Sequence, residues 1–296
     1  MTVLRLTAEP VTDYTAELGE GPLWDANRNR VVWVDIPGQN ILVTDPATGD
    51  TESISTPSWV GAVSLVDSGG YLAALADGVY LGDGSGTWKC LATIDADDDT
   101  MRTNDGKCDP HGSFVVGTIA RDGREGAASL YRVNDRGRTE RLLTGVSISN
   151  GLDWTVDGAT MYYIDTPTRT VVAYPYDYAS PTLGQPERVV EIPDGDGFPD
   201  GMTLDSDGCL WIGLWGGHAV HRYTPDGTLD TIIDVPVTNV TSCAFGGKDL
   251  DTLFVTTATD DSNDGDRTAE PLAGTLFAVS VNVTGRPTTP FRTTGE

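Results

Sequence analysis

The sequence has few cysteines, few histidines, few lysines and no long apolar run. Its 296 residues include three histidines, three lysines and four cysteines (Cys90, Cys108, Cys209 and Cys243). The cysteines stand far apart without a Cys-x-x-Cys pair, which argues against a zinc knuckle or a disulfide framework, and each is predicted to be a small core residue. No stretch approaches the roughly 18 consecutive apolar residues of a membrane span, so a transmembrane protein is excluded.

Positive charge is also scarce. The chain has 19 basic and 44 acidic side chains, a formal net charge of -25, and its acids are 34 Asp and 10 Glu. Such a chain would repel phosphate backbones, which argues against a nucleic-acid partner. An acidic surface with little lysine keeps a protein soluble where molar salt shortens the Debye length to about 3 Å. We therefore expect a halophilic source; the alternative is an acidic enzyme of an ordinary cytosol.

The first ten residues have no apolar segment that ends in a small-residue cleavage site. Nothing in them marks a secreted precursor, so a cytoplasmic location is predicted.

Short runs of β-branched and aromatic residues recur along the whole chain. They are bounded by Gly, Asp, Asn and Pro, and no long pattern of period 3.6 competes with them, so the chain is predicted to be all-β. Turn-forming sequences at 45–49, 134–137 and 224–227 each predict a hairpin. The six strongest runs are residues 30–35, 70–75, 113–117, 160–165, 209–214 and 252–256.

A repeat precedes these six runs. A glycine or serine recurs at intervals of 40, 45, 45, 50 and 41 residues, and each unit has room for about four strands. This period predicts a six-bladed β-propeller with four-stranded antiparallel blades, formed as a single domain over residues 1–296. A β-sandwich would need no repeat.

We expect Thr2–Thr7 to close the ring by adding a strand to the blade that ends near residues 274–279. The acidic run 260–266 is interpreted as a solvated loop, because it lacks the glutamate and flanking helices of an EF-hand.

The residue before each repeated glycine or serine is expected to begin the strand nearest the propeller axis. The six residues therefore converge at one mouth of the channel, where glycine lets the backbones approach closely. They are Glu20, Val60, Asp105, Asn150, Asp200 and Thr241.

Carboxylate and amide oxygens at these positions have no nearby positive partner in sequence. Converging carboxylates in a low-dielectric funnel resist ionisation unless a cation joins them. Two carboxylates and one amide suit a hard ion such as calcium, magnesium or manganese, with water in the remaining positions. The alternative is that these residues only cap backbone groups around a water-filled channel.

The same stretches resemble the gluconolactonase/regucalcin (senescence marker protein) family of sugar-lactone hydrolases. The similarity covers nearly the whole chain in order. The stretches are Gly19–Trp24 (Gly-Glu-x-Pro-x-Trp), Arg102–Lys107 followed by Asp109 (Arg-x-Asn-Asp-Gly-Lys-x-Asp), Ser149–Trp154 (Ser-Asn-Gly-x-x-Trp), Pro199–Met202 (Pro-Asp-Gly-Met) and Pro271–Phe277 in the closing blade.

The resemblance implies a six-bladed propeller that binds one divalent metal ion through Glu20, Asn150 and Asp200. It implies substrate contacts from Arg102 and Asn104, and a structural role for Asp105 in presenting Asn104. Calcium, zinc, manganese, magnesium and iron(II) are all used among relatives. The expected substrate is a small sugar lactone, such as gluconolactone, xylonolactone or arabinonolactone, produced by an aldose dehydrogenase in sugar oxidation.

The chemistry follows from these groups. A metal-bound lactone carbonyl is polarised, and the metal or Arg102 stabilises the oxyanion as water adds. Asp200 is the candidate general base, and Asn104 is expected to hold sugar hydroxyls. No Gly-x-Ser-x-Gly elbow occurs, which argues against a serine hydrolase.

Two other functions stay open at this point. One is organophosphate or aryl-ester hydrolysis on the same fold, which a polar funnel with Arg102 and Asn104 disfavours. The other is a calcium-binding propeller without catalysis, because a fold does not decide a function. The sequence carries no signal for a particular oligomeric state.

Overall fold

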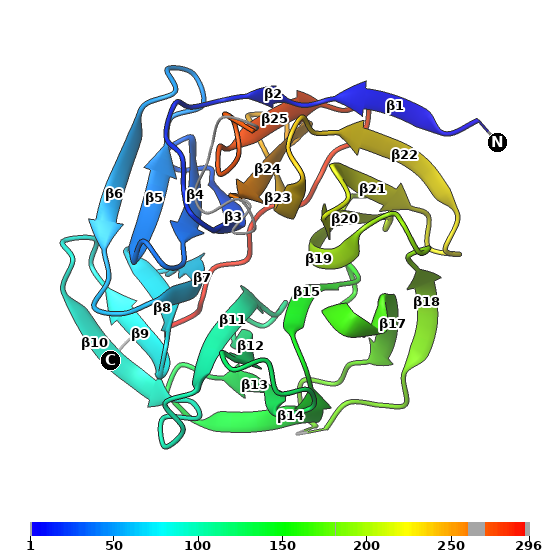
Figure 1. The fold of residues 1–296 in the computed structure, drawn as a ribbon. Coiled ribbons are helices and arrows are strands. Elements are labelled where there is room, and N and C mark those ends of the chain that lie inside the picture. The colour runs from blue at the N-terminus through cyan, green and yellow to red at the C-terminus, as the bar shows by residue number, and fades with distance from the viewer. Residues whose placement is uncertain (1, 181, 260–269, 294–296) are drawn as a thin grey trace.

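The computed structural model describes residues 2–180, 182–259 and 270–293, so the acidic run 260–266 lies outside it. Six β-sheets stand radially around a central channel (Figure 1). The predicted six-bladed propeller with four-stranded antiparallel blades is therefore confirmed. From the axis outward, the strands of blades 1 to 3 are β3 (Gly19–Asp25), β4 (Arg30–Asp35), β5 (Asn40–Thr44) and β6 (Thr51–Ser55); β7 (Val60–Leu65), β8 (Tyr71–Leu75), β9 (Gly78–Gly82) and β10 (Trp88–Thr93); and β11 (Met101–Cys108), β12 (Phe114–Ala120), β13 (Ala128–Val133) and β14 (Thr139–Val146). Those of blades 4 to 6 are β15 (Ser149–Trp154), β16 (Thr160–Asp165), β17 (Thr170–Pro175) and β18 (Glu187–Glu191); β19 (Phe198–Leu204), β20 (Leu210–Trp215), β21 (Ala219–Tyr223) and β22 (Leu229–Asp234); and β23 (Asn239–Gly246), β24 (Thr252–Ala258) and β25 (Phe277–Ser280) with β2 (Glu9–Pro10).

The six strong runs of the sequence are the second strands of the six blades. Each is covered by neighbouring blades on both faces, which is why these runs read as nearly continuous apolar stretches rather than as alternating ones. The three predicted hairpins join the third and fourth strands of blades 1, 3 and 5.

The N-terminal segment does not close the ring as predicted. The strand β1 (Leu4–Thr7) runs parallel to β22 and adds a fifth strand to blade 5, whereas β2 pairs with β25 and completes blade 6. The prediction for Thr2–Thr7 is therefore wrong by one blade. Leu6 faces the core between blades 5 and 6, and Arg5 pairs with Asp234 of β22, so side-chain contacts favour that edge.

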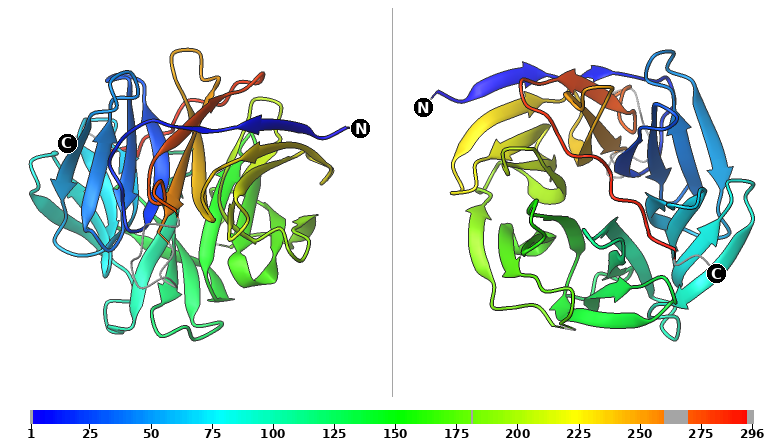
Figure 2. Two further views of the ribbon diagram at one scale, coloured as in Figure 1. Left: turned by 45° about the horizontal axis from the view of Figure 1, so that its top comes forward. Right: turned by 180° about the vertical axis from the view of Figure 1, so that it is seen from behind.

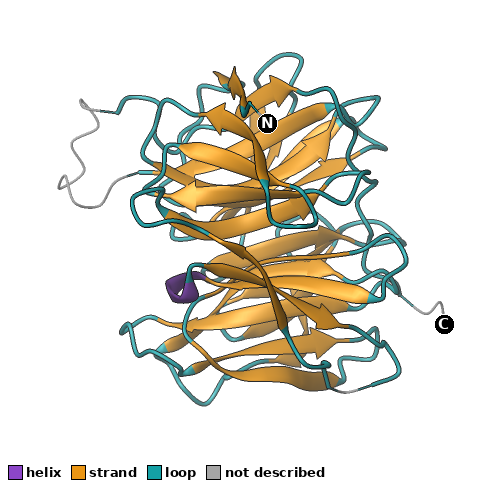
Figure 3. Ribbon diagram, turned by 90° about the vertical axis from the view of Figure 1, so that its right-hand side faces the viewer, coloured by secondary structure: helices purple, strands orange, loops and turns teal. Residues whose placement is uncertain are grey.

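In the part of the chain that the structure describes, almost all regular structure is strand, with one short 3-10 helix, η1 (Thr166–Thr168) (Figure 3). Among the described residues, no helix is long and apolar enough to cross a membrane. Three of the cysteines are buried as predicted, but Cys90 is exposed because it lies on the outermost strand of blade 2.

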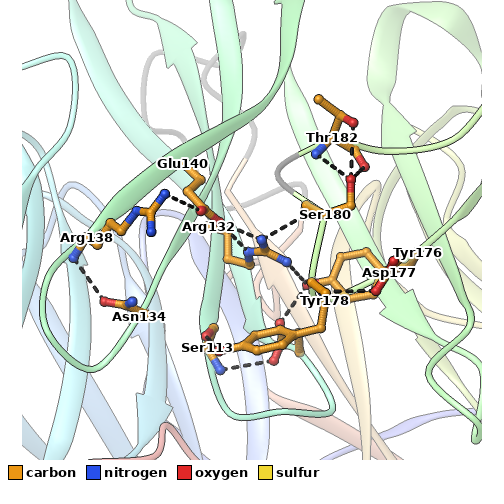
Figure 4. Close-up of polar contacts among 12 residues, drawn as sticks. Ser113, Arg132, Asn134, Arg138, Glu140, Tyr176, Asp177, Tyr178, Ser180 and Thr182 are labelled. Atoms are coloured by element: carbon orange, nitrogen blue, oxygen red, sulfur yellow. Dashed lines mark hydrogen bonds and ion pairs between the residues drawn. The ribbon is translucent and has the colours of Figure 1, made fainter.

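Polar contacts join the outer parts of blades 3 and 4 (Figure 4). Arg132 of β13 donates to Glu140 of its own blade and, over 2.9 Å, to the carbonyl of Ser180, which follows β17. Its guanidinium also lies 5.0 Å from the ring of Tyr178. Tyr176 donates to Asp109 Oδ2 over 2.6 Å. These contacts hold the segment after β17 against blade 3.

After β25 the chain runs across one end of the channel towards blade 2 (Figure 2). We call residues 281–293 the C-terminal strap. Its Phe291 is fully buried between blades 2 and 3 and forms a parallel bridge to Val66.

Candidate metal and lactone site

A β-bulge interrupts the inner strand of every blade at the repeated position. In each inner strand the pairing with the second strand shifts there, as between Pro199 and Met202 of β19. A bulge turns side chains away from the regular alternation and so can aim them along a channel. The repeat found in the sequence is therefore the repeat of this bulge.

Glycine is needed at the bulges of blades 2, 4 and 5 because the next blade approaches closely there. A Cβ on Gly151 would lie 2.7 Å from the carbonyl oxygen of Asp200, and one on Gly61 would lie 2.5 Å from that of Asn104. Contacts this short are forbidden, so the expectation that glycine permits close approach is confirmed.

Glu20, Asn150 and Asp200 lie on the inner strands of blades 1, 4 and 5, and all three are buried. Burial, together with the negative charge of Asp105, raises the pKa of Glu20 to about 8. Burial, together with the charges of Glu20 and Asp105, raises the pKa of Asp200 well above its usual range. The charge of Asp105 therefore opposes the ionisation of both Glu20 and Asp200, and the charge of Glu20 also opposes that of Asp200.

Asp105 differs from the other two acids in the cation that acts on it. Like Asp200 it lies within the bulge of its inner strand, and like Glu20 it accepts from the backbone N–H of the next residue, here Gly106 over 2.7 Å. Burial raises its pKa, while Lys107 acts in the opposite direction. This placement is compatible with the structural role that the family resemblance implies.

Hydrogen bonds hold the two asparagines in one orientation. Asn104 Nδ2 donates to Asn150 Oδ1 over 3.0 Å and to the carbonyl of Ser149 over 2.8 Å. Asn150 Nδ2 donates to Thr166 Oγ1, which in turn donates to the carbonyl of Pro199, the residue before Asp200. Asn104, Asn150 and the backbone of Asp200 therefore belong to one network across blades 3, 4 and 5.

Arg102 reaches the same region from β11. Its Nη1 donates to Asn104 Oδ1 over 2.7 Å and to the carbonyl of Thr103. Burial lowers its pKa to about 10, with Glu20 and Asp200 acting in the opposite direction, so the guanidinium stays protonated at neutral pH. Within the described residues it forms no ion pair with a carboxylate. Its charge is therefore available to a ligand.

Sequence reasoning missed three residues beside these groups. Trp59 lies 5.8 Å from the guanidinium of Arg102 and 4.5 Å from that of Arg121, and Thr166 orients Asn150. Trp59 could have been found from the sequence, because it directly precedes the repeated position Val60. Thr166 and Arg121 follow strong strand runs and could not be distinguished from other loop residues.

The donor set fits a hard divalent cation. Asp200 Oδ1 is a buried oxygen without any hydrogen-bond partner, and burying such an atom costs free energy unless something binds it. Among the residues that the structure describes, Glu20 accepts only from the N–H of its neighbour Gly21. No group of three His, Cys, Asp or Glu side chains that could hold a metal ion occurs in the described part of the chain. The candidate site is not such a group, because one of its three donors is the amide of Asn150.

A cavity of about 430 Å³ occupies the channel on the other side of the bulges. Glu20, Asn150 and Asp200 do not line it, but Asp105 does. Further residues of its wall are Lys107, Asp153, Thr203 and Arg286. The channel thus has two halves, with the acidic site in one and an ion-paired cavity in the other.

The fold and this arrangement define a six-bladed β-propeller with a polar site built on the inner-strand bulges. Residues 18–259 match the model of the SMP-30/gluconolactonase/LRE-like region. The chain therefore belongs to this family, as the sequence motifs indicated.

Relatives span nearly the whole chain. A putative sugar lactone lactonase, YvrE, of Bacillus subtilis is 41% identical over 286 residues, which are 94% of this chain and 96% of that protein. Pentonolactonase XacC of Haloferax volcanii is 38% identical and covers 95% of this chain and 97% of its own. The crystal structure of a calcium-binding protein, regucalcin, from Agrobacterium tumefaciens superposes with a TM-score of 0.92 at 30% identity, over 99% of both chains.

Proposed function

We propose that this protein hydrolyses sugar lactones to the corresponding aldonic acids, with one divalent cation held by Glu20, Asn150 and Asp200. The observation that carries the proposal is the partnerless Oδ1 of Asp200, buried beside the like charge of Glu20 and within one network with Asn150. The names of the relatives from Bacillus subtilis and Haloferax volcanii support the substrate class.

Each residue of the site has a role in this proposal. A divalent cation, when bound, would supply Lewis-acid polarisation of the lactone carbonyl. Arg102 donates to the carbonyl oxygen, which becomes negative as water adds, and Asn104 binds hydroxyl groups of the ring. The carboxylate of Asp200 accepts the proton of the attacking water. The bond between the carbonyl carbon and the ring oxygen then breaks, the ring oxygen takes up the proton that Asp200 had accepted, and the open-chain aldonic acid leaves and releases its own proton to solvent.

Arg102 is suited to this role because it is held before substrate arrives. Its Nη1 is bonded to Asn104 and to the backbone, and its guanidinium lies beside Trp59. A donor that is already oriented need not reorganise when charge develops on the substrate.

The experiment is a titration of acid release at constant pH from glucono-, galactono-, xylono- and arabinonolactone. Each rate is corrected for spontaneous hydrolysis. The chelator-treated protein is compared with the same protein given Ca²⁺, Mn²⁺, Mg²⁺, Zn²⁺ or Fe²⁺. We expect hydrolysis that depends on the added cation. Full activity after chelation, or no activity with any cation and lactone, would contradict the proposal.

A second candidate function is calcium binding without catalysis. The structural likeness to a regucalcin described as a calcium-binding protein favours it. Calorimetric binding of Ca²⁺ with no hydrolysis of any of the four lactones would identify this function instead.

A further inference from the structure

The C-terminal strap forms hydrogen bonds with all six blades. In the chain order of its residues 284–292, these are blades 5, 6, 4, 1, 2 and 3. The contacts are Ser206 N to Thr284 O, Gly285 N to Leu250 O, Arg286 Nη2 to Asp153 Oδ1, Thr288 Oγ1 to Trp24 O, Phe291 N to Leu65 O and Arg292 N to Gly112 O, over 2.7–2.9 Å. Five of these contacts involve a backbone atom. The contact with blade 4 is different, because it joins two charged side chains.

Asp153 is the residue through which the Arg286 side chain of the strap contacts the inner strands of blades 3, 4 and 5. Its Oδ1 accepts from Arg286 Nη2 over 2.8 Å, and its Oδ2 accepts from Lys107 Nζ over 3.2 Å and from the backbone N–H of Leu204 over 3.0 Å. Lys107 Nζ also donates to the carbonyl of Met202. One carboxylate thus ties together β11, β15, β19 and the strap.

These contacts lie next to the candidate site along the channel. Lys107, Asp153 and Thr203 each follow a site residue by three positions on the same inner strand, after Asn104, Asn150 and Asp200 respectively. Thr203 Oγ1 donates to Asp153 Oδ2 over 3.3 Å. A displacement of these strands at Lys107, Asp153 and Thr203 would therefore change the relative positions of Asn104, Asn150 and Asp200.

We propose that Arg286 is a positioning residue of the site. Through Asp153 it holds the inner strands of blades 3, 4 and 5 at the spacing that brings Asn104, Asn150 and Asp200 together. Lys107 also joins these three strands, through Asp153 Oδ2 and the carbonyl of Met202, but only Arg286 among the two cations comes from the strap and so ties the strands to the rest of the ring. The activity part of the test rests on the proposed lactonase function, but the inference about position does not.

The test compares Arg286→Ala with Arg286→Lys and with the matched control Arg292→Ala, all in the full chain. Arg292 lies on the same strap, is exposed, and meets blade 3 through its backbone N–H, which alanine keeps. Circular dichroism and the thermal midpoint report on folding. Calorimetry with Mn²⁺ and the separate values of kcat and KM report on the site. Proton exchange of the ¹⁵N-labelled side-chain amides of Asn104 and Asn150 reports on the position of these residues without any ligand.

We expect Arg286→Ala to weaken Mn²⁺ binding and to lower kcat by about 10- to 100-fold, the usual effect of removing a group that orients metal ligands. The two asparagine amides should exchange faster, Arg286→Lys should recover part of the loss, and Arg292→Ala should match the wild type. If Arg286→Ala lowers only the thermal midpoint and leaves Mn²⁺ affinity and amide exchange unchanged, the proposal is wrong. If Arg286→Ala does not fold, Arg286→Lys and Asp153→Asn decide the question by the same amide exchange.

Failure of the function proposal gives a different result. A wild-type protein that hydrolyses no lactone and binds no cation would contradict the proposed function. The asparagine exchange would still show whether Arg286 positions the inner strands.

Discussion

Asn104 and Asn150 are joined side chain to side chain across the boundary of blades 3 and 4, with Asn104 Nδ2 donating to Asn150 Oδ1 over 3.0 Å. The first is a candidate substrate contact and the second a candidate metal ligand. Because Asn150 Nδ2 is bonded to Thr166, the oxygen of Asn150 is held in one direction. We therefore expect binding of substrate and binding of the cation to be coupled through this amide pair.

This pair makes the substitution Asn104→Ala informative. It removes the donor that orients Asn150 Oδ1 as well as the proposed contact with sugar hydroxyls. We expect KM for the lactone to rise and cation affinity to fall by about 10-fold, because the group that orients a ligand is lost. Calorimetry with Mn²⁺ in the absence of lactone checks the second effect. Unchanged cation affinity would show that Asn104 contacts substrate only.

Removing a negative charge from the site should have opposite effects on stability and on activity. Glu20→Gln and Asp200→Asn keep the shape of the side chain but end the repulsion between buried carboxylates. In chelator we expect each variant to unfold about 2–4 °C above the wild type, for about 1 kcal/mol of relieved repulsion. Cation binding and lactone hydrolysis should both be lost. Asp122→Asn, an exposed acid paired with Arg124, is the control and should change neither property. A lower thermal midpoint in both variants would show that the carboxylates are not in conflict.

Asp153 should stabilise the fold in a pH-dependent way. Burial by itself would raise its pKa, but Lys107 and Arg286, with two backbone N–H donors, hold the pKa below the ordinary value of 3.8. A carboxyl whose folded pKa is lowered contributes stability above its unfolded pKa, and this stability is lost as pH falls through the folded pKa. The substitution Asp153→Asn leaves two cations without their partner, and should cost about 3–5 kcal/mol of unfolding free energy at pH 6.

Urea unfolding at a series of pH values between 6 and 3 measures this effect. The difference between wild type and Asp153→Asn should be constant down to about pH 4 and should shrink below it, because the wild-type carboxylate then takes up its proton. A difference that stays constant to pH 3 would mean that the charge of Asp153 does not stabilise the fold.

The two N-terminal strands should contribute unequally to stability. In β1 only Leu6 is partly buried, whereas Ala8, which precedes β2, is almost fully buried between blades 5 and 6. Removal of residues 2–7 should lower the thermal midpoint by only a few degrees, since it exposes one edge of blade 5. Removal of residues 2–12 should lower it much more, because blade 6 loses β2 and the ring loses its closure. Equal effects in calorimetry would contradict this assignment of the closing strand.

The family resemblance and the repeat predicted most of the fold. Local pattern was sufficient for this, because a second strand such as residues 160–165 is buried on both faces and bounded by turn formers, and these properties are present in the sequence itself. The repeated residue before each glycine also indicated which side chains converge, since every blade uses the same bulge to face the channel. The exposed position of Cys90 was not predicted, because it depends on the place of β10 at the outer edge of blade 2.

The sequence by itself determined the number of blades, the strands that form them and the acidic groups that meet at the channel, because these properties repeat at short range along the chain. Only the tertiary structure decided which blade β1 joins and which cation faces which carboxylate. Arg286 and Asp153 are 133 residues apart, and Lys107 and Asp153 are 46 apart. Such pairs form only when the closed ring brings distant strands together, and no pattern within one blade records them.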